Sequence, residues 1–128
     1  MSRRRKTKAR ESIHDHRSLR GAPPHGAVVH GNVVYLAGQV GRDHRAPVAE
    51  QTRQTLSEID RLLALAGTDK SKLLTAQVWL ADMRDFDEMN GVWEAWTAPG
   101  NAPARACTEA RLAPPGWSVE IMVTAALD

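Results

Sequence analysis

Two amphipathic helix candidates with a single strand candidate between them restrict the fold of this chain more than any other feature. The first helix is predicted over residues 47–66, where apolar side chains recur at steps of three and four residues. Pro47 suits its first turn, and Gly67 suits the position just after its end. A strand is predicted over residues 73–81 and a second helix over 86–97. A strand–helix–strand unit normally makes a right-handed crossover between parallel strands, so part of the sheet should be parallel.

Pairs of short strand candidates flank this central unit on both sides. On the N-terminal side, residues 27–30 and 33–37 are joined by a Gly-Asn turn signal, which predicts a hairpin. On the C-terminal side, residues 105–112 and 117–124 alternate in polarity around Pro-Pro-Gly, which predicts a second hairpin. We therefore expect an α+β fold, with a mixed sheet of about six strands and both helices packed on one face.

Length and composition fit a single domain. The chain has 128 residues, of which 42% are hydrophobic, as is ordinary for a globular protein. No apolar run approaches the roughly 18 residues of a membrane span, so no membrane association is expected. The single cysteine, Cys107, excludes an internal disulfide framework and favours a reducing, cytoplasmic compartment. All five histidines precede the first helix without the spacing of a metal site, so no metal is expected.

Positive charge is concentrated in the first 20 residues. They carry eight Lys or Arg against two acidic residues, a net charge of +6, whereas the remainder carries −4. One interpretation is an arm that binds nucleic acid or another anionic surface. The other, which we prefer, is a disordered and solvated extension with too few apolar residues to pack. We therefore divide the chain into a basic tail, residues 1–20, and a single domain, residues 21–128.

Arg105 and Glu120 are the candidate functional residues, and they lie in the two strands of the second predicted hairpin. In one interpretation Arg105 binds both oxygens of a substrate carboxylate, and Glu120 holds a water molecule and takes its proton. In the other, both lie on a solvated sheet face, where alternating polar residues are normal. Composition and alternation alone favour the second. We expect the open sheet face to carry Gln77, Trp79, Arg105 and Glu120, and such a half-polar face usually meets another subunit.

From about residue 27 to 127 the chain resembles the Rid family of reactive-intermediate deaminases, also called the YjgF family. Four segments carry the resemblance: Gly31-Asn32-Val33-Val34-Tyr35-Leu36-Ala37-Gly38-Gln39-Val40, Gln51-Thr52-Arg53-Gln54-Thr55-Leu56, Trp79-Leu80-Ala81-Asp82-Met83 continuing to Phe86 and Asn90, and Pro103-Ala104-Arg105-Ala106-Cys107 with Val119-Glu120-Ile121. The last is specific, because both of its parts stand at the right separation from the rest. Val92-Trp93-Glu94-Ala95-Trp96 before Pro99-Gly100 resembles a YoaB-like subgroup.

The resemblance implies a chorismate-mutase-like fold and a homotrimer with its sites at the subunit clefts. It implies hydrolysis of 2-enamine or 2-imine acids, such as 2-aminoacrylate and 2-iminopropanoate, to a 2-keto acid and ammonia, without a cofactor. Arg105 would bind the substrate carboxylate, and Glu120 would position the attacking water. Cys107, through its backbone, would line the substrate pocket together with Asn90 and the turn formed by Gly38 and Gln39.

Two positions depart from the family pattern. Pro24 or His25 stands where well-studied members have a tyrosine, and Ala37 stands where they have a serine before the Gly-Gln pair. Both changes remove hydroxyls near the substrate, which leaves the substrate range and the rate open. The alternatives are a non-catalytic ligand-binding or interaction trimer and, ranked last, an endoribonuclease or translation inhibitor. Nucleic acid ranks last as a partner because the basic residues lie in the tail and the core has few aromatic residues for base stacking.

Overall fold

The structure is a computed structural model, and it describes residues 17–19, 21–23, 26–113 and 115–128. The predictions for residues 1–16 and for Pro24 and His25 lie outside these described residues. The elements, in chain order, are β1 (Arg17–Ser18), β2 (Ala27–His30), β3 (Val33–Leu36), α2 (Val48–Leu65), β4 (Leu73–Leu80), α3 (Phe86–Trp96), β5 (Ala104–Glu109) and β6 (Val119–Ala126). Short 3-10 turns over Lys70–Lys72 and Met83–Asp85 precede β4 and α3. No helix in the described part of the chain is long and apolar enough to cross a membrane.

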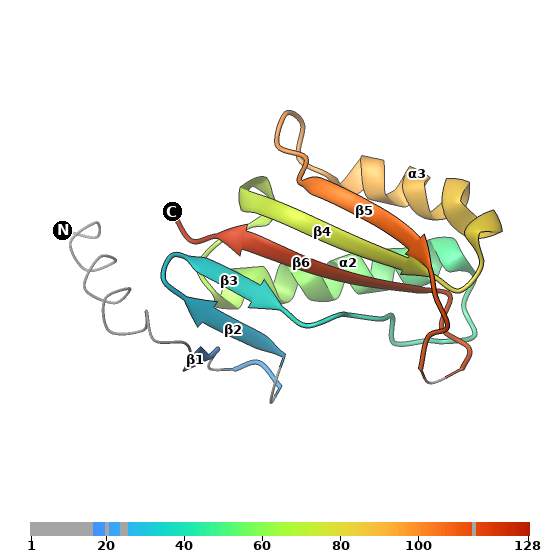
Figure 1. Cartoon of the computed structure of the whole chain (residues 1–128), viewed down its shortest axis with the longest axis horizontal. Coiled ribbons are helices and arrows are strands. Elements are labelled where there is room, and N and C mark those ends of the chain that lie inside the picture. The colour runs from blue at the N-terminus through green and yellow to red at the C-terminus, as the bar shows by residue number, and fades with distance from the viewer. Residues whose placement is uncertain (1–16, 20, 24–25, 114) are drawn as a thin grey trace.

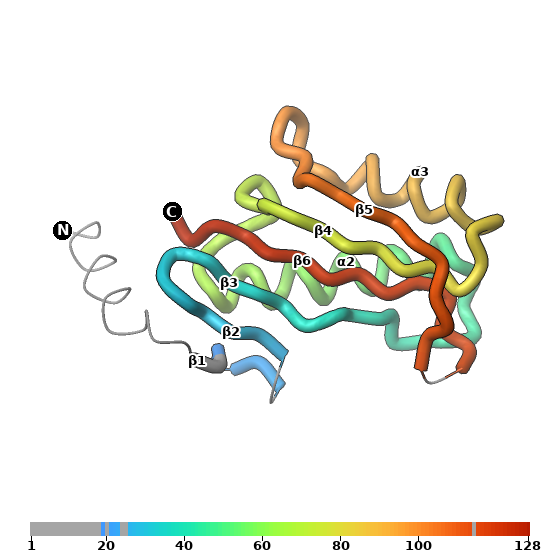
Figure 2. The backbone as a smooth tube through the Cα atoms, in the orientation of Figure 1, coloured from blue at the N-terminus to red at the C-terminus, as the bar shows by residue number. Residues whose placement is uncertain are grey.

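One mixed sheet of six strands, in the order β1-β2-β3-β6-β4-β5, forms the body of the molecule. Its neighbouring strands are antiparallel except β4 and β5, which run parallel and are connected through α3 (Figure 1). Both helices cover the same face of this sheet, as the backbone trace in Figure 2 shows. The α+β architecture, the mixed sheet and the one-sided helix layer predicted from the sequence are therefore confirmed.

The predicted hairpin between the last two strands is wrong. β5 pairs in parallel with β4, and β6 pairs with β3 and β4, so that β4 separates β5 from β6. The connection between β5 and β6 begins and ends beside the end of β4. Two backbone hydrogen bonds join the ends of this connection to the end of β4. The Ala110 N–H donates to the Leu80 carbonyl at 2.9 Å, and the Ala81 N–H donates to the Ser118 carbonyl at 3.0 Å. The right-handed crossover through α3 favours β5 beside β4, which leaves the opposite edge of β4 for β6.

The core lies between the sheet and the two helices. A β-bulge between Leu73 and Thr75 shifts the pattern of β4: Leu73 is 7% exposed and Leu74 is 44% exposed, although strict alternation places Leu74 on the core face. The largest buried side chains on the helices and central strands pack together here, among them Leu56, Ile59, Leu62, Leu63, Val78, Leu80, Met89 and Ile121. The open face of the sheet is thus left with the alternate, partly polar residues.

Gln51 is a buried amide on α2 that holds together the loops at one end of the sheet. Its Nε2 donates to the carbonyl oxygens of His44 and Ala46 at 3.2 and 2.9 Å, and its Oε1 accepts the Ser118 N–H at 2.8 Å. A buried polar group is tolerated when its hydrogen bonds are satisfied, as they are here. Because Ser118 directly precedes β6, these bonds fix the start of the strand that carries Glu120.

Candidate active site

Arg105 lies on the edge strand β5 with its side chain on the helix-covered side of the sheet. It is paired with Ala76, whose side chain is buried under the helices, and paired residues point to the same face. The Arg105 Nη1 donates a 2.7 Å hydrogen bond to Asn90 Oδ1 on α3. The guanidinium carbon lies 5.2 Å from the ring centroid of Trp93 and 5.8 Å from that of Phe86. One amide and two aromatic rings therefore hold the guanidinium in place.

No carboxylate in the described part of the chain forms an ion pair with Arg105. The guanidinium has five N–H donors, of which Asn90 accepts from one. A positive charge fixed by neutral neighbours, with donors to spare, is suited to binding an anion from outside the chain. The predicted carboxylate-binding role of Arg105 fits this geometry.

The aromatic residues of α3 serve both the core and Arg105. Their spacing in the sequence is typical of a core stripe, and Trp93 is indeed buried. Phe86, Asn90 and Trp93 follow one another at steps of four and three residues, so one helix face meets Arg105. The contact of Phe86 and Trp93 with the guanidinium was not predicted from the sequence, because the position of α3 relative to β5 is set by the crossover.

Glu120 lies on β6 and points to the open face of the sheet. Its neighbour across the sheet is Trp79, and the flanking residues Val119 and Ile121 are buried on the helix side. Gly38 lies directly under this side chain: a Cβ built there would collide with the Glu120 carboxylate. Only glycine allows the backbone to come this close to the carboxylate.

Gln39 fixes the same turn against β6. Its N–H donates to the Ile121 carbonyl at 2.8 Å, and the Ile121 N–H donates back to the Gln39 carbonyl at 3.0 Å. The Gln39 Nε2 donates to the Ala37 carbonyl at 2.9 Å. The structure therefore brings Gly38 and Gln39 to Glu120, just as it brings Asn90 and Cys107 to Arg105.

The two groups lie on opposite faces of the sheet, which corrects the prediction that Arg105 and Glu120 share its open face. Arg105 is paired with Ala76 on β4, and Glu120 is paired with Trp79, three residues along the same strand. Successive side chains of a strand alternate between the faces, so an odd spacing puts the two side chains on opposite sides. The prediction holds for Glu120, Gln77 and Trp79, and it is wrong for Arg105.

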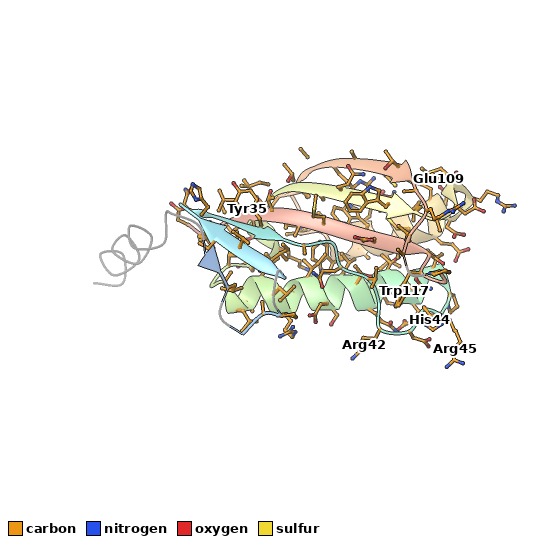
Figure 3. The ribbon with its side chains drawn as sticks, turned by 60° about the horizontal axis from the view of Figure 1, so that its bottom comes forward. Tyr35, Arg42, His44, Arg45, Glu109 and Trp117 are labelled. Carbon is orange, nitrogen blue, oxygen red and sulfur yellow. The ribbon has the colours of Figure 1, made fainter. Side chains whose placement is uncertain are left out.

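The open face is hollowed and partly apolar. Tyr35 on β3 and Met122 on β6 are 45% and 40% exposed there. They line a hollow of about 490 Å³ together with Thr75, Gln77, Ala104, Ala106 and Thr124. Figure 3 shows Tyr35 on this sheet, away from the loops that carry His44 and Trp117. Such a surface is of the kind that another protein chain covers.

His44 and Trp117 join two loops near the start of β6, a contact that was not predicted from the sequence. Their ring centroids are 5.3 Å apart, and the Trp117 Nε1 donates to the Gly41 carbonyl at 2.7 Å. Both side chains lie together in Figure 3, where Arg42 and Arg45 project from the same loop as His44. The alternating pattern of residues 117–124 predicts a strand residue at Trp117, and the loop position of this side chain differs from that prediction.

Cys107 is two residues beyond Arg105 on the same strand face, half-buried against the core. Burial raises the pKa of its thiol, and the nearby Arg105 lowers that pKa by less. A raised pKa keeps the thiol neutral at pH 7, which makes it a poor nucleophile. In the described residues no group of three or more His, Cys, Asp or Glu side chains is placed to hold a metal ion.

Replacing Cys107 by serine is expected to leave the rate of the imine hydrolysis that the resemblance implies within about twofold of wild type. The reason is that the thiolate is not formed at neutral pH. Alkylation of Cys107 by iodoacetamide should be slow at pH 7 and should accelerate only above the ordinary cysteine pKa. Steady-state kinetics of the serine variant measure the first effect, and the alkylation rate of the wild-type protein as a function of pH measures the second. A tenfold loss of turnover with an unchanged melting temperature would give the thiol a direct role.

Comparison with known proteins identifies relatives of this chain. The family described as endoribonuclease L-PSP matches residues 21–127. A RutC family protein from Haemophilus ducreyi is 52% identical over 100 residues, covering 78% of this chain and 86% of that protein. A 2-iminobutanoate/2-iminopropanoate deaminase from Bos taurus is 35% identical over 101 residues, covering 74% and 73%.

A solved structure extends the likeness to most of the chain. The crystal structure of a YjgF family member from Neisseria meningitidis has a TM-score of 0.84 and 46% identity, covering 91% of this chain and 98% of that one. The matched family, the sequence identity and the fold agree with one another. The chain therefore belongs to the endoribonuclease L-PSP family, which is the YjgF or Rid family.

Proposed function

We propose that the protein hydrolyses small 2-imino acids, of the 2-iminopropanoate and 2-iminobutanoate type, to a 2-keto acid and ammonia. The observation that carries the proposal is the Arg105 guanidinium, which is held by Asn90, Trp93 and Phe86 and lacks a described carboxylate partner. Similarity to deaminases of this name, at 35% and 31% identity over 101 and 105 residues, supports the substrate class.

The chemistry needs few groups. The carbon of a protonated imine is already electrophilic, so no nucleophilic side chain is required. Arg105 would hold the substrate carboxylate, and Glu120 would accept a proton from a water molecule as its oxygen attacks that carbon. Glu120 would then return this proton to the nitrogen of the carbinolamine. The carbon–nitrogen bond breaks and ammonia leaves as the carbon–oxygen double bond forms, and the hydroxyl proton passes to the departing ammonia, which gives ammonium. Holding the substrate and the water together supplies much of the rate enhancement.

A complete site requires a second copy of the chain, and we propose a homotrimer with shared sites. Within one chain the sheet separates Arg105 from Glu120, so one substrate molecule cannot reach both. The exposed Tyr35 and Met122 and the hollow beside them offer a surface for the second copy. Arg105 of one subunit would then act with Glu120 of its neighbour.

Imine hydrolysis is tested directly by using an amino-acid oxidase or a dehydratase to generate 2-iminopropanoate in the assay. The wild-type protein should accelerate release of the 2-keto acid and ammonia over the reaction in buffer. If a 2-keto acid binds at the site but the imine decays at the uncatalysed rate, the chain is a ligand-binding trimer. In that case, and also if neither binding nor turnover is seen, the deaminase proposal is wrong.

The shared site predicts complementation between two inactive variants. When Arg105→Ala and Glu120→Gln chains are co-expressed with different tags, each mixed trimer contains one cleft with both native residues. Activity of the doubly purified mixture should recover to about a third of wild type, whereas each variant alone stays low. Light scattering should give the mass of three chains for every sample. Mixed trimers without recovered activity would show that a single chain supplies both residues.

A further inference from the structure

The amide of Asn90 takes part in two hydrogen bonds, one on each side. On one side its Oδ1 accepts from the Arg105 Nη1 at 2.7 Å, and on the other its Nδ2 donates to Glu94 Oε1 at 2.7 Å. From these contacts we infer that Glu94 is a positioning residue for Arg105 and acts through Asn90. The inference deepens the proposed function, because it concerns how the carboxylate-binding arginine is oriented.

The two partners of Asn90 leave its amide one orientation. A carboxylate can only accept hydrogen bonds and a guanidinium can only donate them, whereas an amide has one side of each kind. With Nδ2 turned to Glu94, the carbonyl oxygen must face Arg105. With the amide reversed, its N–H groups would face the donors of Arg105, and its oxygen would face the carboxylate. Glu94 therefore adds to the preference for the orientation in which Asn90 presents its oxygen to the guanidinium.

The spacing of residues on α3 brings Glu94 to Asn90. Asn90 and Glu94 are separated by four residues on α3, so they lie one turn apart on the same face. Trp93 on that face also contacts the guanidinium at 5.2 Å from its ring centroid. Glu94 itself is exposed, and its carboxylate reaches Arg105 only through the amide. Arg105 is therefore oriented without direct neutralisation of its charge.

The neutral side chain of Asn90, which lies between Glu94 and Arg105, matters for the binding of an anion. A carboxylate bonded directly to Arg105 would form an ion pair and compete with the substrate carboxylate for the same donors. Asn90 instead accepts one N–H and leaves the others available. Glu94 helps to orient the Asn90 amide, and the amide separates the negative charge of Glu94 from the guanidinium.

The experiment compares Glu94→Ala, Glu94→Gln and the control Glu88→Ala. Glu88 is an exposed carboxylate on the same helix with no ion pair in the described structure, so its loss controls for the change in helix charge. Glu94→Ala should raise KM for 2-iminopropanoate, and the inhibition constant of pyruvate, about five- to tenfold with kcat within about twofold. Glu94→Gln should recover most of this loss, because its Oε1 can still accept from Asn90. Glu88→Ala should behave as wild type.

A crystal structure of Glu94→Ala and calorimetric binding of pyruvate separate this inference from the deaminase proposal. In the variant the Asn90–Arg105 hydrogen bond should be lost or lengthened and the guanidinium displaced. If the wild type binds pyruvate without turning over the imine, weaker pyruvate binding by Glu94→Ala supports the positioning role while the deaminase proposal fails. An unmoved guanidinium with unchanged KM and pyruvate affinity overturns the positioning role, whatever the wild-type activity is. A fall in melting temperature with unchanged pyruvate affinity overturns it as well, because Glu94 would then only stabilise α3.

Discussion

Arg105→Ala is expected to lower kcat/KM for 2-imino acids by more than about a hundredfold, and Arg105→Lys by about ten- to a hundredfold. A hydrogen bond to a charged group contributes about 1.5–3 kcal/mol, and the guanidinium can offer two to one carboxylate. Lysine keeps the charge but loses the planar fork. It also lacks the flat group that lies near the rings of Trp93 and Phe86 and the Nη1 that bonds Asn90.

Arg111→Ala is the matched control for this prediction. Arg111 follows β5 in the same stretch of chain, is exposed, and lines the hollow of the 109–117 connection instead of facing α3. Its removal changes the net charge equally and should leave kcat/KM unchanged. Light scattering and thermal melting check that each variant keeps its assembly and fold. If Arg105→Ala retains wild-type turnover, the carboxylate site is elsewhere and the deaminase proposal loses its main support.

Glu120→Gln is expected to lower kcat by about a hundredfold with little change in KM, the lower end of what a general base contributes. The amide is nearly the same size, so it fits over Gly38 and can still hold a water molecule. It cannot accept the proton of that water. The loss should therefore appear in the chemical step and not in binding.

Glu109→Gln provides the control for a carboxylate-to-amide change. Glu109, labelled in Figure 3, is exposed at the end of β5. It accepts a hydrogen bond from the Met83 N–H at 2.8 Å, and an amide oxygen can accept the same bond. Single-turnover measurements with preformed imine separate chemistry from product release. Equal single-turnover rates for wild type and Glu120→Gln would leave Glu120 as a residue of the sheet face with no part in proton transfer.

Local patterns in the sequence predicted the elements well. The first helix, expected over 47–66, is found over Val48–Leu65, and Gly67 follows it with a φ of 83°, the conformation that glycine favours after a helix end. Alternation also grouped Arg105 with Cys107 on one strand face, as observed. These features depend on neighbours within a few residues, and such neighbours are visible in the chain itself.

The pairing of the last two strands could not be predicted in this way. Whether β5 lies beside β6 or beside β4 depends on the crossover through α3, and alternation in β5 is the same in either case. The error moved Arg105 to the wrong face of the sheet. The bulge at Leu73 is a second example, since it shifts the pattern within β4 without a glycine or proline to mark it. The hydrogen bond of Glu94 with Asn90 had a local signal, the spacing of four residues on α3, but no motif distinguished it.

The placement of Arg105 and Glu120 on opposite faces also has a genetic consequence. In the proposed trimer every subunit contributes to two clefts, one through each face of its sheet. A chain that lacks both Arg105 and Glu120 but still assembles therefore inactivates the two clefts to which it contributes. The native residues that its partners supply to those clefts are then also without effect. Such an allele should be dominant over the normal gene in a cell that expresses both, and more damaging than a deletion that removes the chain altogether.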